Sequence, residues 1–292
     1  MASGPTYSGP AVASRDYGED GSLTDPSVTE REAFDAAREW AVEAVRMALD
    51  DDAAEGKQKS DPFDIVTPAD GAIERYLRGQ VRERFPDHEF LGEEEGGADG
   101  ASGWQWVVDP IDGTYNYATG LSGAATSIAC RHDGELVVGV VADLTAQRVY
   151  GALRGTRTIL MQDAHGTSVV EPSNTPAGAA RIFLEFGWED LDAVMVGTIE
   201  DLAGLKPRVI RMVSGAAYAL LNVALRGGSF LGIGLRIWDL AAGMVLVREA
   251  GRQVRVWEEG GRVHLVVGGA DDIRDLAPIV ERYGSSRVAL AS

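Results

Sequence analysis

The segment from Trp106 to Thr114, Trp-Val-Val-Asp-Pro-Ile-Asp-Gly-Thr, constrains the fold of this chain more than any other. Its first half has the composition of a buried strand, and the strand leads directly into a turn with two acids, Asp109 and Asp112. Pro110 stiffens that turn because its ring fixes one backbone dihedral angle. Hard divalent cations such as Mg²⁺ prefer oxygen ligands, and the two carboxylates flank the carbonyl of Ile111. The segment therefore predicts a strand that ends at a metal site.

The residues that follow favour an anion beside this metal. Gly113 has no side chain to block the approach of an anion. A helix that begins near Thr114 or Asn116 would leave unpaired backbone amides and a partial positive charge at its start. One turn would then hold both a metal and a phosphate. Taken alone, however, the motif is also typical of an Asp-rich surface turn at the end of a strand.

Three further segments carry acids in comparable positions. An acidic run, Glu93 to Glu95, follows an apolar pair, and Asp239 follows Trp238 at the start of an apolar helical stretch. Asp70 stands where a capping-box acid would, three residues after a suitable N-cap, Thr67. Each segment alone has an ordinary explanation, namely a solvated loop, a helix N-cap and a helix start.

Together and in this order, the four segments resemble the inositol monophosphatase superfamily of metal-dependent, lithium-sensitive sugar phosphatases. The resemblance spans roughly Val28 to Tyr283 and rests on D-P-I-D-G-T, with G-E-E before it and W-D-x-A-A-G after it. It implies an α+β or α/β chain folded as the layered αβαβα sandwich of the inositol monophosphatase and fructose-1,6-bisphosphatase type. It also implies two or three Mg²⁺ ions. Carried over residue by residue, the metal ligands fall on Glu93, Asp109, the carbonyl of Ile111, Asp112 and Asp239.

The same resemblance implies roles for other residues. Thr114 and Asp70 correspond to the pair that polarises the attacking water, with Glu93 helping to orient it. Lys59 and Asp64 match supporting positions upstream. The residues expected to bind substrate are Asp112, the amides of Gly113 and Thr114, the segment Ser214, Gly215 and Ala216, and Arg236.

The chemistry explains why metals are expected to dominate this site. Phosphate monoester hydrolysis needs rate enhancements of up to about 10²¹-fold, whereas one general base supplies about 10²- to 10⁴-fold. Metal ions can activate the water and neutralise charge on the leaving oxygen. We therefore expect direct attack by water, with inversion at phosphorus and no phosphoenzyme.

The alcohol that leaves is not fixed by the sequence. In inositol-specific members an acid lies seven positions before the Trp-Asp aspartate, and here that position is Gly232. The order Ser214-Gly215 also differs from the usual Gly-Thr or Gly-Ser. An inositol, another cyclitol or sugar, histidinol and fructose bisphosphate remain open, and a 3',5'-bisphosphonucleotide is a weaker alternative. Arg236 either meets a second anionic group or pairs with a nearby acid.

Four aromatic residues beside these motifs have two explanations each. Phe186 and Trp188 follow a predicted strand end and either form a wall of the substrate pocket or belong to the core. Tyr115 and Tyr117, beside the catalytic turn, are likewise packing or pocket residues.

A function from a different class is a non-catalytic binding or regulatory partner that keeps the fold. The complete set of metal acids argues against a pure loss of catalysis. Other enzyme classes lack their motifs, since the sequence has no H-E-x-x-H, no G-x-S-x-G and no Walker loop.

Charge and composition restrict the partners. The formal net charge of -18 repels nucleic acid and anionic membranes, and without bound cations it should also repel a phosphate ester. A small phosphorylated substrate is the partner that the resemblance implies. The single cysteine, Cys130, excludes an internal disulfide and has the setting of a core residue. Without a transmembrane run or a signal peptide, a cytoplasmic enzyme is the default expectation. A homodimer is implied by the resemblance alone.

The chain is expected to divide into three parts. Residues 1–26 read as a disordered extension, residues 27–175 as an α+β lobe with most metal ligands, and residues 176–292 as an α/β lobe that carries Asp239. Helical spacing begins at Ser27, with Thr29 and Glu32 as its capping box. Strands are predicted at 181–186, 209–213 and 229–231, with a flexible connector at 96–103.

Overall fold

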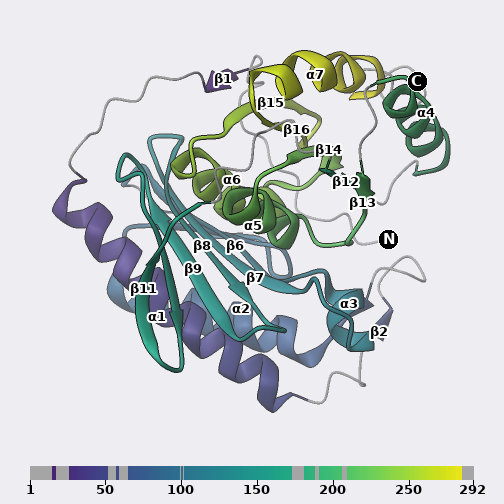
Figure 1. Cartoon of the computed structure of the whole chain (residues 1–292). Coiled ribbons are helices and arrows are strands. Elements are labelled where there is room, and N and C mark those ends of the chain that lie inside the picture. Colours follow the sequence, from purple (N-terminus) through teal and green to yellow (C-terminus); the bar gives the residue numbers. More distant parts are fainter. Residues whose placement is uncertain are drawn as a thin grey trace.

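A computed structural model of the chain describes residues 15–17, 26–51, 57–58, 65–98, 100, 102–172, 181–187, 191–205 and 209–284. Two sheets and their helices are stacked in layers, as Figure 1 shows. Two short elements, β2 (Lys57–Gln58) and β3 (Ile65–Val66), pair separately beside the sandwich. No helix in the described part of the chain combines the length and the apolar character needed to cross a membrane.

The first sheet has eight strands, which come from one continuous part of the chain. Their spatial order is β11-β10-β9-β8-β7-β6-β4-β5. All neighbours are antiparallel except β4 and β6. The strands are β4 (Glu89–Gly92), β5 (Gly97–Ala98), β6 (Trp104–Asp112), β7 (Ala125–His132), β8 (Glu135–Asp143), β9 (Arg148–Leu153), β10 (Ile159–Asp163) and β11 (Gly166–Val170).

Helices α1 (Val28–Asp50) and α2 (Pro68–Arg84) cover the outer face of this sheet. A stripe of small residues and Trp40 on α1 is buried against it. The N-cap of this helix is Ser27, two residues before the predicted Thr29, because Ser27 and Glu30 form the capping box instead of Thr29 and Glu32. Both pairs fit the same Ser/Thr-x-x-Glu pattern, so the pattern alone did not choose between them.

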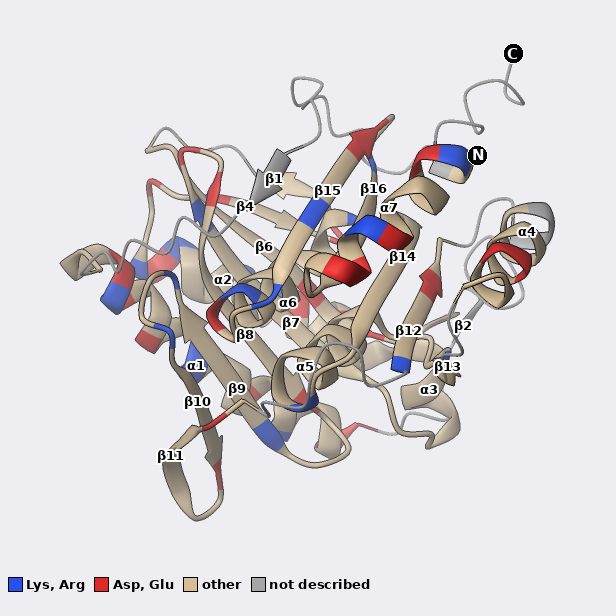
Figure 2. Cartoon of the chain, turned by 45° about the horizontal axis from the view of Figure 1, so that its top comes forward, with Lys and Arg blue, Asp and Glu red and all other residues tan. Residues whose placement is uncertain are grey.

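Helices α5 (Ala216–Arg226) and α6 (Ile237–Glu249) form the middle layer between the two sheets. Their side chains join one hydrophobic cluster that includes strands of both sheets. Figure 2 draws α5 in tan except at its end, because Arg226 is its one charged residue. A helix that is apolar all round is the kind expected in an interior.

The second sheet has six strands in the order β1-β15-β16-β14-β12-β13. The strands β12, β13 and β14 are mutually parallel and β1, β15 and β16 are joined antiparallel. Helices α4 (Leu191–Ala203) and α7 (Ala270–Gly284) lie on its outer face. The strands are β1 (Arg15–Tyr17), β12 (Arg181–Phe186), β13 (Val209–Arg211), β14 (Ser229–Leu235), β15 (Gln253–Glu259) and β16 (Arg262–Gly268).

These layers confirm the predicted αβαβα sandwich, with local corrections. Residues 97–98 of the predicted connector form β5, and the strand predicted at 209–213 ends at Arg211. Within the extension predicted to be disordered, Arg15–Tyr17 form β1 on the edge of the second sheet, and its other residues up to Asp25 lie outside the described ranges. Cys130 is buried in β7, as expected. The division into two lobes at residue 175 stays a prediction.

Candidate active site

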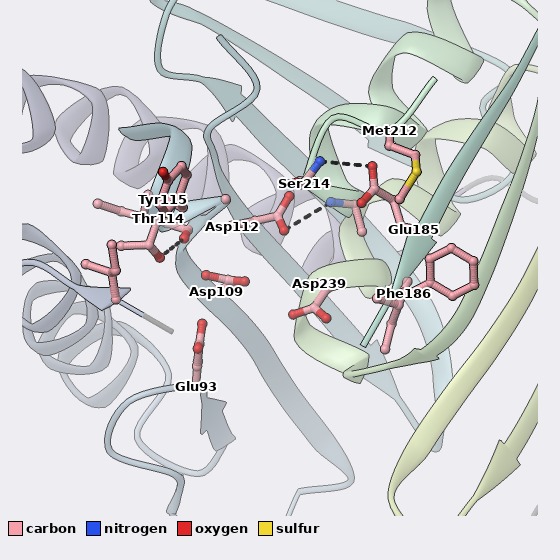
Figure 3. Close-up of a pocket in the computed structure, with 16 residues that line it drawn as sticks. Glu93, Asp109, Asp112, Thr114, Tyr115, Glu185, Phe186, Met212, Ser214 and Asp239 are labelled. Atoms are coloured by element: carbon pink, nitrogen blue, oxygen red, sulfur yellow. Dashed lines mark hydrogen bonds between the residues drawn. The ribbon is translucent and has the colours of Figure 1, made fainter. Parts of the chain in front are cut away.

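Two strand ends bring the first acids together. The strands β4 and β6 run parallel, and their pairing ends with Gly92 opposite Val108, so the residues that follow lie at the same end of the eight-stranded sheet. Glu93 follows β4 directly, and Asp109 follows Val108. The two carboxylates therefore meet at this end, as Figure 3 shows.

A bulge in β6 aims the next acid. The register between β6 and β7 shifts between Asp109 and Asp112, which leaves Pro110 and Ile111 outside the ladder. The Thr126 hydroxyl of β7 donates to the carbonyl of Pro110 at 2.8 Å and fixes the bulge. Bulges of this kind re-aim side chains next to functional sites. Here the bulge allows two acids three residues apart to face the same space.

The start of α5 receives the side chain of Asp112. The amide of Ala216 donates to its Oδ1 at 3.1 Å and the amide of Ala217 to its Oδ2 at 2.7 Å. These amides have no partner within the helix, so the carboxylate satisfies them. The acid is thereby oriented by the middle layer as well as by its own strand.

The start of α6 supplies the last acid, Asp239. Its Oδ2 accepts the amide of Arg236 at 2.9 Å, which places Asp239 in the first turn of the helix. The Ser127 hydroxyl of β7 donates to the carbonyl of Trp238 at 2.9 Å, inside the core. This contact ties the start of α6 to the sheet that carries Asp109.

Asp109, Asp112 and Asp239 form a cluster in which one oxygen from each lies within 4.8 Å of the others. Burial raises the pKa of Asp109 well above its usual range, and the charges of Glu93, Asp112, Asp239 and Asp70 raise it further. Burial likewise raises the pKa of Asp112 and of Asp239, against the hydrogen bonds that lower them. The fold thus keeps the carboxylates of Asp109, Asp112 and Asp239 close together although their negative charges repel one another.

The cluster fits a hard cation. Asp109 Oδ1 is buried and has no hydrogen-bond partner among the described residues. A buried carboxylate oxygen without a partner is costly unless a cation or a proton compensates it. Oxygen donors alone, several of them charged, are what Mg²⁺ prefers.

The predicted pair of Thr114 and Asp70 is also in contact. Asp70 has no exposed surface, and its Oδ2 accepts the amide and the hydroxyl of Thr67 at 2.7 and 2.5 Å. Its Oδ1 accepts from the Thr114 hydroxyl at 3.3 Å, while the same hydroxyl lies 2.8 Å from the carbonyl of Ile111. One hydroxyl proton serves one acceptor at a time, so Asp70 and Ile111 compete for it.

A further acid, Glu74, was not expected from the sequence. It is fully buried on α2 and accepts the amides of Glu94 and Glu95 at 2.7 and 2.8 Å. Arg78 balances its charge with a contact of 2.8 Å. Since these amides follow Glu93 directly, Glu74 fixes the loop that presents Glu93. Its spacing from Asp70, four residues along one helix face, was the signal available in the sequence.

A second unexpected acid, Glu185, lies at the end of β12. Its Oε1 accepts the amides of Val213 and Ser214 at 2.9 and 3.1 Å. Burial raises its pKa to about 7, against the lowering effect of these amides. The signal in the sequence was an acid inside an otherwise apolar parallel strand, where only a specific partner offsets the cost of burial.

These groups surround a pocket of about 160 Å³ (Figure 3). Its lining includes all four acids that were predicted to bind metal, together with Ile111, Gly113, Thr114 and Glu185. Phe186 and Tyr115 also line it, whereas Tyr117 packs with its hydroxyl on the carbonyl of Ala48 at 2.6 Å. Lys59, Asp64 and Trp188 lie outside the described residues.

The predicted substrate segment lines the pocket but uses its amides internally. Ser214, Gly215 and Ala216 all face the cavity. However, the amide of Ser214 is bonded to Glu185 and that of Ala216 to Asp112. These two amides therefore have partners within the protein, and contact between this segment and the substrate stays a prediction.

Arg236 is not among the residues that line this pocket. Its guanidinium lies over the ring of Trp238, 5.9 Å from the centroid, and 3.4 Å from the carbonyl of Gly261. Its charge lowers the pKa of Asp239. In the structure Arg236 thus supports the start of α6 and does not reach the cavity.

Comparison with known proteins gives relatives over most of the chain. A sequence model of the inositol monophosphatase family matches residues 25–282. Inositol-1-monophosphatase SuhB of Mycobacterium tuberculosis is 33% identical over 285 residues, which are 90% of this chain and 93% of that protein. The Nus factor SuhB of Pasteurella multocida is 34% identical over 216 residues, 70% of this chain and 76% of that protein.

Solved structures show the same fold. The structure of Mycobacterium tuberculosis SuhB aligns with a TM-score of 0.70 and 29% sequence identity, and the alignment covers 87% of this chain and 97% of that one.

Proposed function

The chain belongs to the inositol monophosphatase family, whose members are phosphoric monoester hydrolases, and we propose that it releases phosphate from a small alcohol by Mg²⁺-dependent attack of water. The observation that carries this proposal is the buried cluster of Asp109, Asp112 and Asp239 with an unpartnered oxygen. Buried carboxylates of this kind need a cation to compensate their negative charge, and a phosphate ester needs positive charge to bind beside them.

Glu93, Asp109, the carbonyl of Ile111, Asp112 and Asp239 are the proposed ligands of two or three Mg²⁺ ions. When bound, the ions would lower the pKa of a water molecule and neutralise charge on the phosphate and on the leaving oxygen. Contacts within the protein orient these groups. Three separate contacts do so, from Thr126 to Pro110, from Ser127 to Trp238 and from the start of α5 to Asp112.

We propose that Thr114, Asp70 and Glu93 orient the attacking water. The Asp70 carboxylate is anchored by Thr67 and can accept the proton of the Thr114 hydroxyl. That hydroxyl oxygen would then accept a hydrogen bond from the water, which leaves one lone pair of the water aimed at phosphorus. Attack in line with the leaving oxygen inverts the configuration at phosphorus.

The phosphate would lie against the backbone of Gly113 and Thr114. Gly113 has a φ of 80°, and a β-carbon there would stand 2.7 Å from the carbonyl of Gly123. Glycine is therefore needed for both the conformation and the space. The amides at this turn start α3 (Thr114–Thr119), where donors are unpaired.

A volume of about 160 Å³ supports a small leaving alcohol. Pockets for drug-sized ligands are roughly 300–1,000 Å³. A cyclitol, a sugar or an amino alcohol such as histidinol fits this limit better than a nucleotide with two phosphates. Inhibition by lithium is part of the same proposal, because it is a property of the family.

A regulatory role is the second candidate, since one relative is named a Nus factor. The net charge of -18 disfavours direct contact with nucleic acid. The intact acid cluster supports catalysis, whatever partners the protein has.

The test is phosphate release from myo-inositol 1-phosphate, histidinol phosphate, fructose 1,6-bisphosphate and adenosine 3',5'-bisphosphate, with Mg²⁺ or with EDTA. We expect release from at least one ester, no release in EDTA, and a loss of more than about 100-fold in kcat/KM for Asp109→Asn, beyond the range for an outer-shell residue. Asp35→Asn, an exposed acid on α1, is the matched control and should be unaffected. Release that persists in EDTA would contradict the proposal.

A further inference from the structure

The pocket has two chemically different sides. Glu93 and Asp109 lie on one side, and Glu185 lies across the cavity beyond Asp112 and Asp239 (Figure 3). The charges agree with this arrangement, because Glu93 raises the pKa of Asp109 whereas Glu185 raises that of Asp112. If Glu93 orients the water, in-line attack directs the leaving alcohol toward the Glu185 side.

The apolar residues of the pocket are partly on this same side. Met212 lines the pocket and precedes the segment whose amides Glu185 accepts. Leu235, at the end of β14, completes this wall. Glu185 is therefore a polar group on the side of the pocket that Met212 and Leu235 line, an arrangement that specifies the orientation of a ligand.

The neighbouring strand β14 supplies no acid at the matching position. Gly232 is the direct partner of Glu185 in the parallel pairing of β12 and β14. A β-carbon at Gly232 would lie 2.7 Å from Leu235 Cδ1 and 2.7 Å from the Phe230 ring. The space that a side chain would need is filled by these two apolar groups.

Glu185 has hydrogen-bonding capacity left for a ligand. A carboxylate offers about four acceptor sites. The amides of Val213, Ser214 and Gly215 fill at most three of them. A donor on the leaving alcohol would make a charge-assisted bond, which is stronger than a bond between neutral groups.

On the basis of the proposed function, we propose that Glu185 is a specificity-determining residue that accepts a hydrogen bond from a hydroxyl or ammonium group of the leaving alcohol. The preferred substrate is then an ester whose alcohol presents a donor to Glu185 and an apolar face to Met212 and Leu235.

The test uses three esters of equal size, 2-hydroxyethyl phosphate, 2-aminoethyl phosphate and propyl phosphate, with the full-length protein and Mg²⁺. The wild type should prefer at least one donor-bearing ester over propyl phosphate in kcat/KM. Glu185→Gln keeps a carbonyl oxygen for the amides of Val213 and Ser214 but removes the charge. It should reduce that preference by about tenfold or more, the loss expected for a bond to a charged group.

The two donor-bearing esters show which kind of donor Glu185 accepts. The ester whose kcat/KM falls more in Glu185→Gln carries the preferred group, either a hydroxyl or an ammonium. Should the small esters react too slowly, the same ratio is taken between the best ester of the larger panel and phenyl phosphate, whose leaving group has no donor. Asn116→Ala is the matched control, because Asn116 holds the same loop through the carbonyl of Val213 at 2.6 Å. It should lower kcat/KM for donor and non-donor esters alike.

The outcomes are distinguishable. Equal losses for all esters in Glu185→Gln, or a wild type without any preference for donors, would overturn the role of Glu185 while the phosphatase stands. Absence of phosphate release from every ester by the wild type would overturn the proposed function itself.

Discussion

Glu74 illustrates how a single side chain acts on the site without entering it. Its two oxygens hold the amides of Glu94 and Glu95, and Arg78 neutralises it. A β-carbon at Gly92 would collide with its carboxylate, so glycine is required where β4 passes Glu74. The position of Glu93 therefore depends on a residue that has no contact with the pocket.

We predict that Glu74→Gln weakens Mg²⁺ activation. A glutamine retains one acceptor but loses the charge and offers a donor to an amide, which misplaces the loop of Glu93. Outer-shell changes of this kind cost about 10- to 100-fold in metal affinity or activity. The measurement is the Mg²⁺ concentration for half-maximal phosphate release. Glu83→Gln, exposed on the same helix, should leave that concentration unchanged, and an equal shift in both variants would refute the role of Glu74.

A second prediction concerns the repulsion within the acid cluster. Every contribution to the pKa of Asp109 raises it, so in the absence of a cation this carboxylate destabilises the folded state. Asp109→Asn should raise the melting temperature in EDTA, by about 2–4 °C for each kcal/mol of repulsion removed. The same variant should lose most of the stabilisation that Mg²⁺ gives the wild type.

Thermal melts of both proteins, with EDTA and with Mg²⁺, test this prediction. A variant that is less stable than the wild type in both conditions would show that Asp109 has a mainly structural role.

At the scale of elements, an aromatic stack links β6, β7 and the turn after α2. His88 stacks on Trp104 with ring centroids 5.3 Å apart, and Trp104 stacks on His132 at 4.1 Å. His88 Nδ1 accepts the indole proton of Trp106 at 3.1 Å, so a neutral ring fits best. Burial lowers the pKa of His88, Asp87 opposes this, and the nearby His132 lowers it further.

This stack predicts a pH dependence of stability. Because the pKa of His88 is lower in the folded state than its usual 6.5, the unfolded chain binds more protons between these two values. The contribution of neutral His88 is therefore present above about pH 6.5 and is lost as the pH falls below it. His88→Gln should show a smaller fall in melting temperature from pH 7.5 to pH 5.5 than the wild type.

The exposed His165 provides the matched control. His165→Gln should reproduce the wild-type fall in melting temperature, and an unchanged fall in His88→Gln would refute the prediction.

The elements that the sequence predicted are those with a local signal. The apolar run into Asp109, the Thr67 helix start and the strand Arg181–Phe186 all carry their pattern within a few residues. The hairpin of β10 and β11 does not, because its second strand is largely exposed and lacks alternation. The pairing of β1 with β15 joins distant parts of the chain, which no local pattern reveals.

The site divides in the same way. The acids proposed to bind metal belong to compact motifs, whereas Glu74 lies in a charged helix and Glu185 in a largely apolar strand, both outside such a motif. Their importance comes from backbone amides that only the folded chain brings to them. The hydrogen bonds from the Ser214 amide to Glu185 and from the Ala216 amide to Asp112 could not be predicted for the same reason.

At the scale of the whole molecule, the middle layer packs tightly against the eight-stranded sheet where β8 meets α6. A β-carbon at Gly139 of β8 would overlap the carbonyl of Ala242 and lie 2.7 Å from Val245 Cβ on α6. The eight-stranded sheet thus meets α6 almost backbone to backbone, and α6 carries Asp239.

Gly139→Ala should therefore destabilise the protein by about 1–3 kcal/mol, the usual cost of overpacking. Gly79→Ala is the contrasting control, because a β-carbon there meets nothing within 4 Å and the residue lies inside α2. It should stabilise the protein by about 0.5–1 kcal/mol. Denaturant unfolding measures both, and a neutral Gly139→Ala would show that the layers can separate without cost.

The position of α6 also bears on how the protein is made. Glu93, Asp109 and Asp112 leave the ribosome early, while Asp239 lies far toward the other end of the chain and is placed only once α6 enters the space between the sheets. A nascent chain that has the first three acids lacks the fourth and lacks the α5 amides that orient Asp112. The acid cluster therefore cannot be complete before the chain has been synthesised as far as α6.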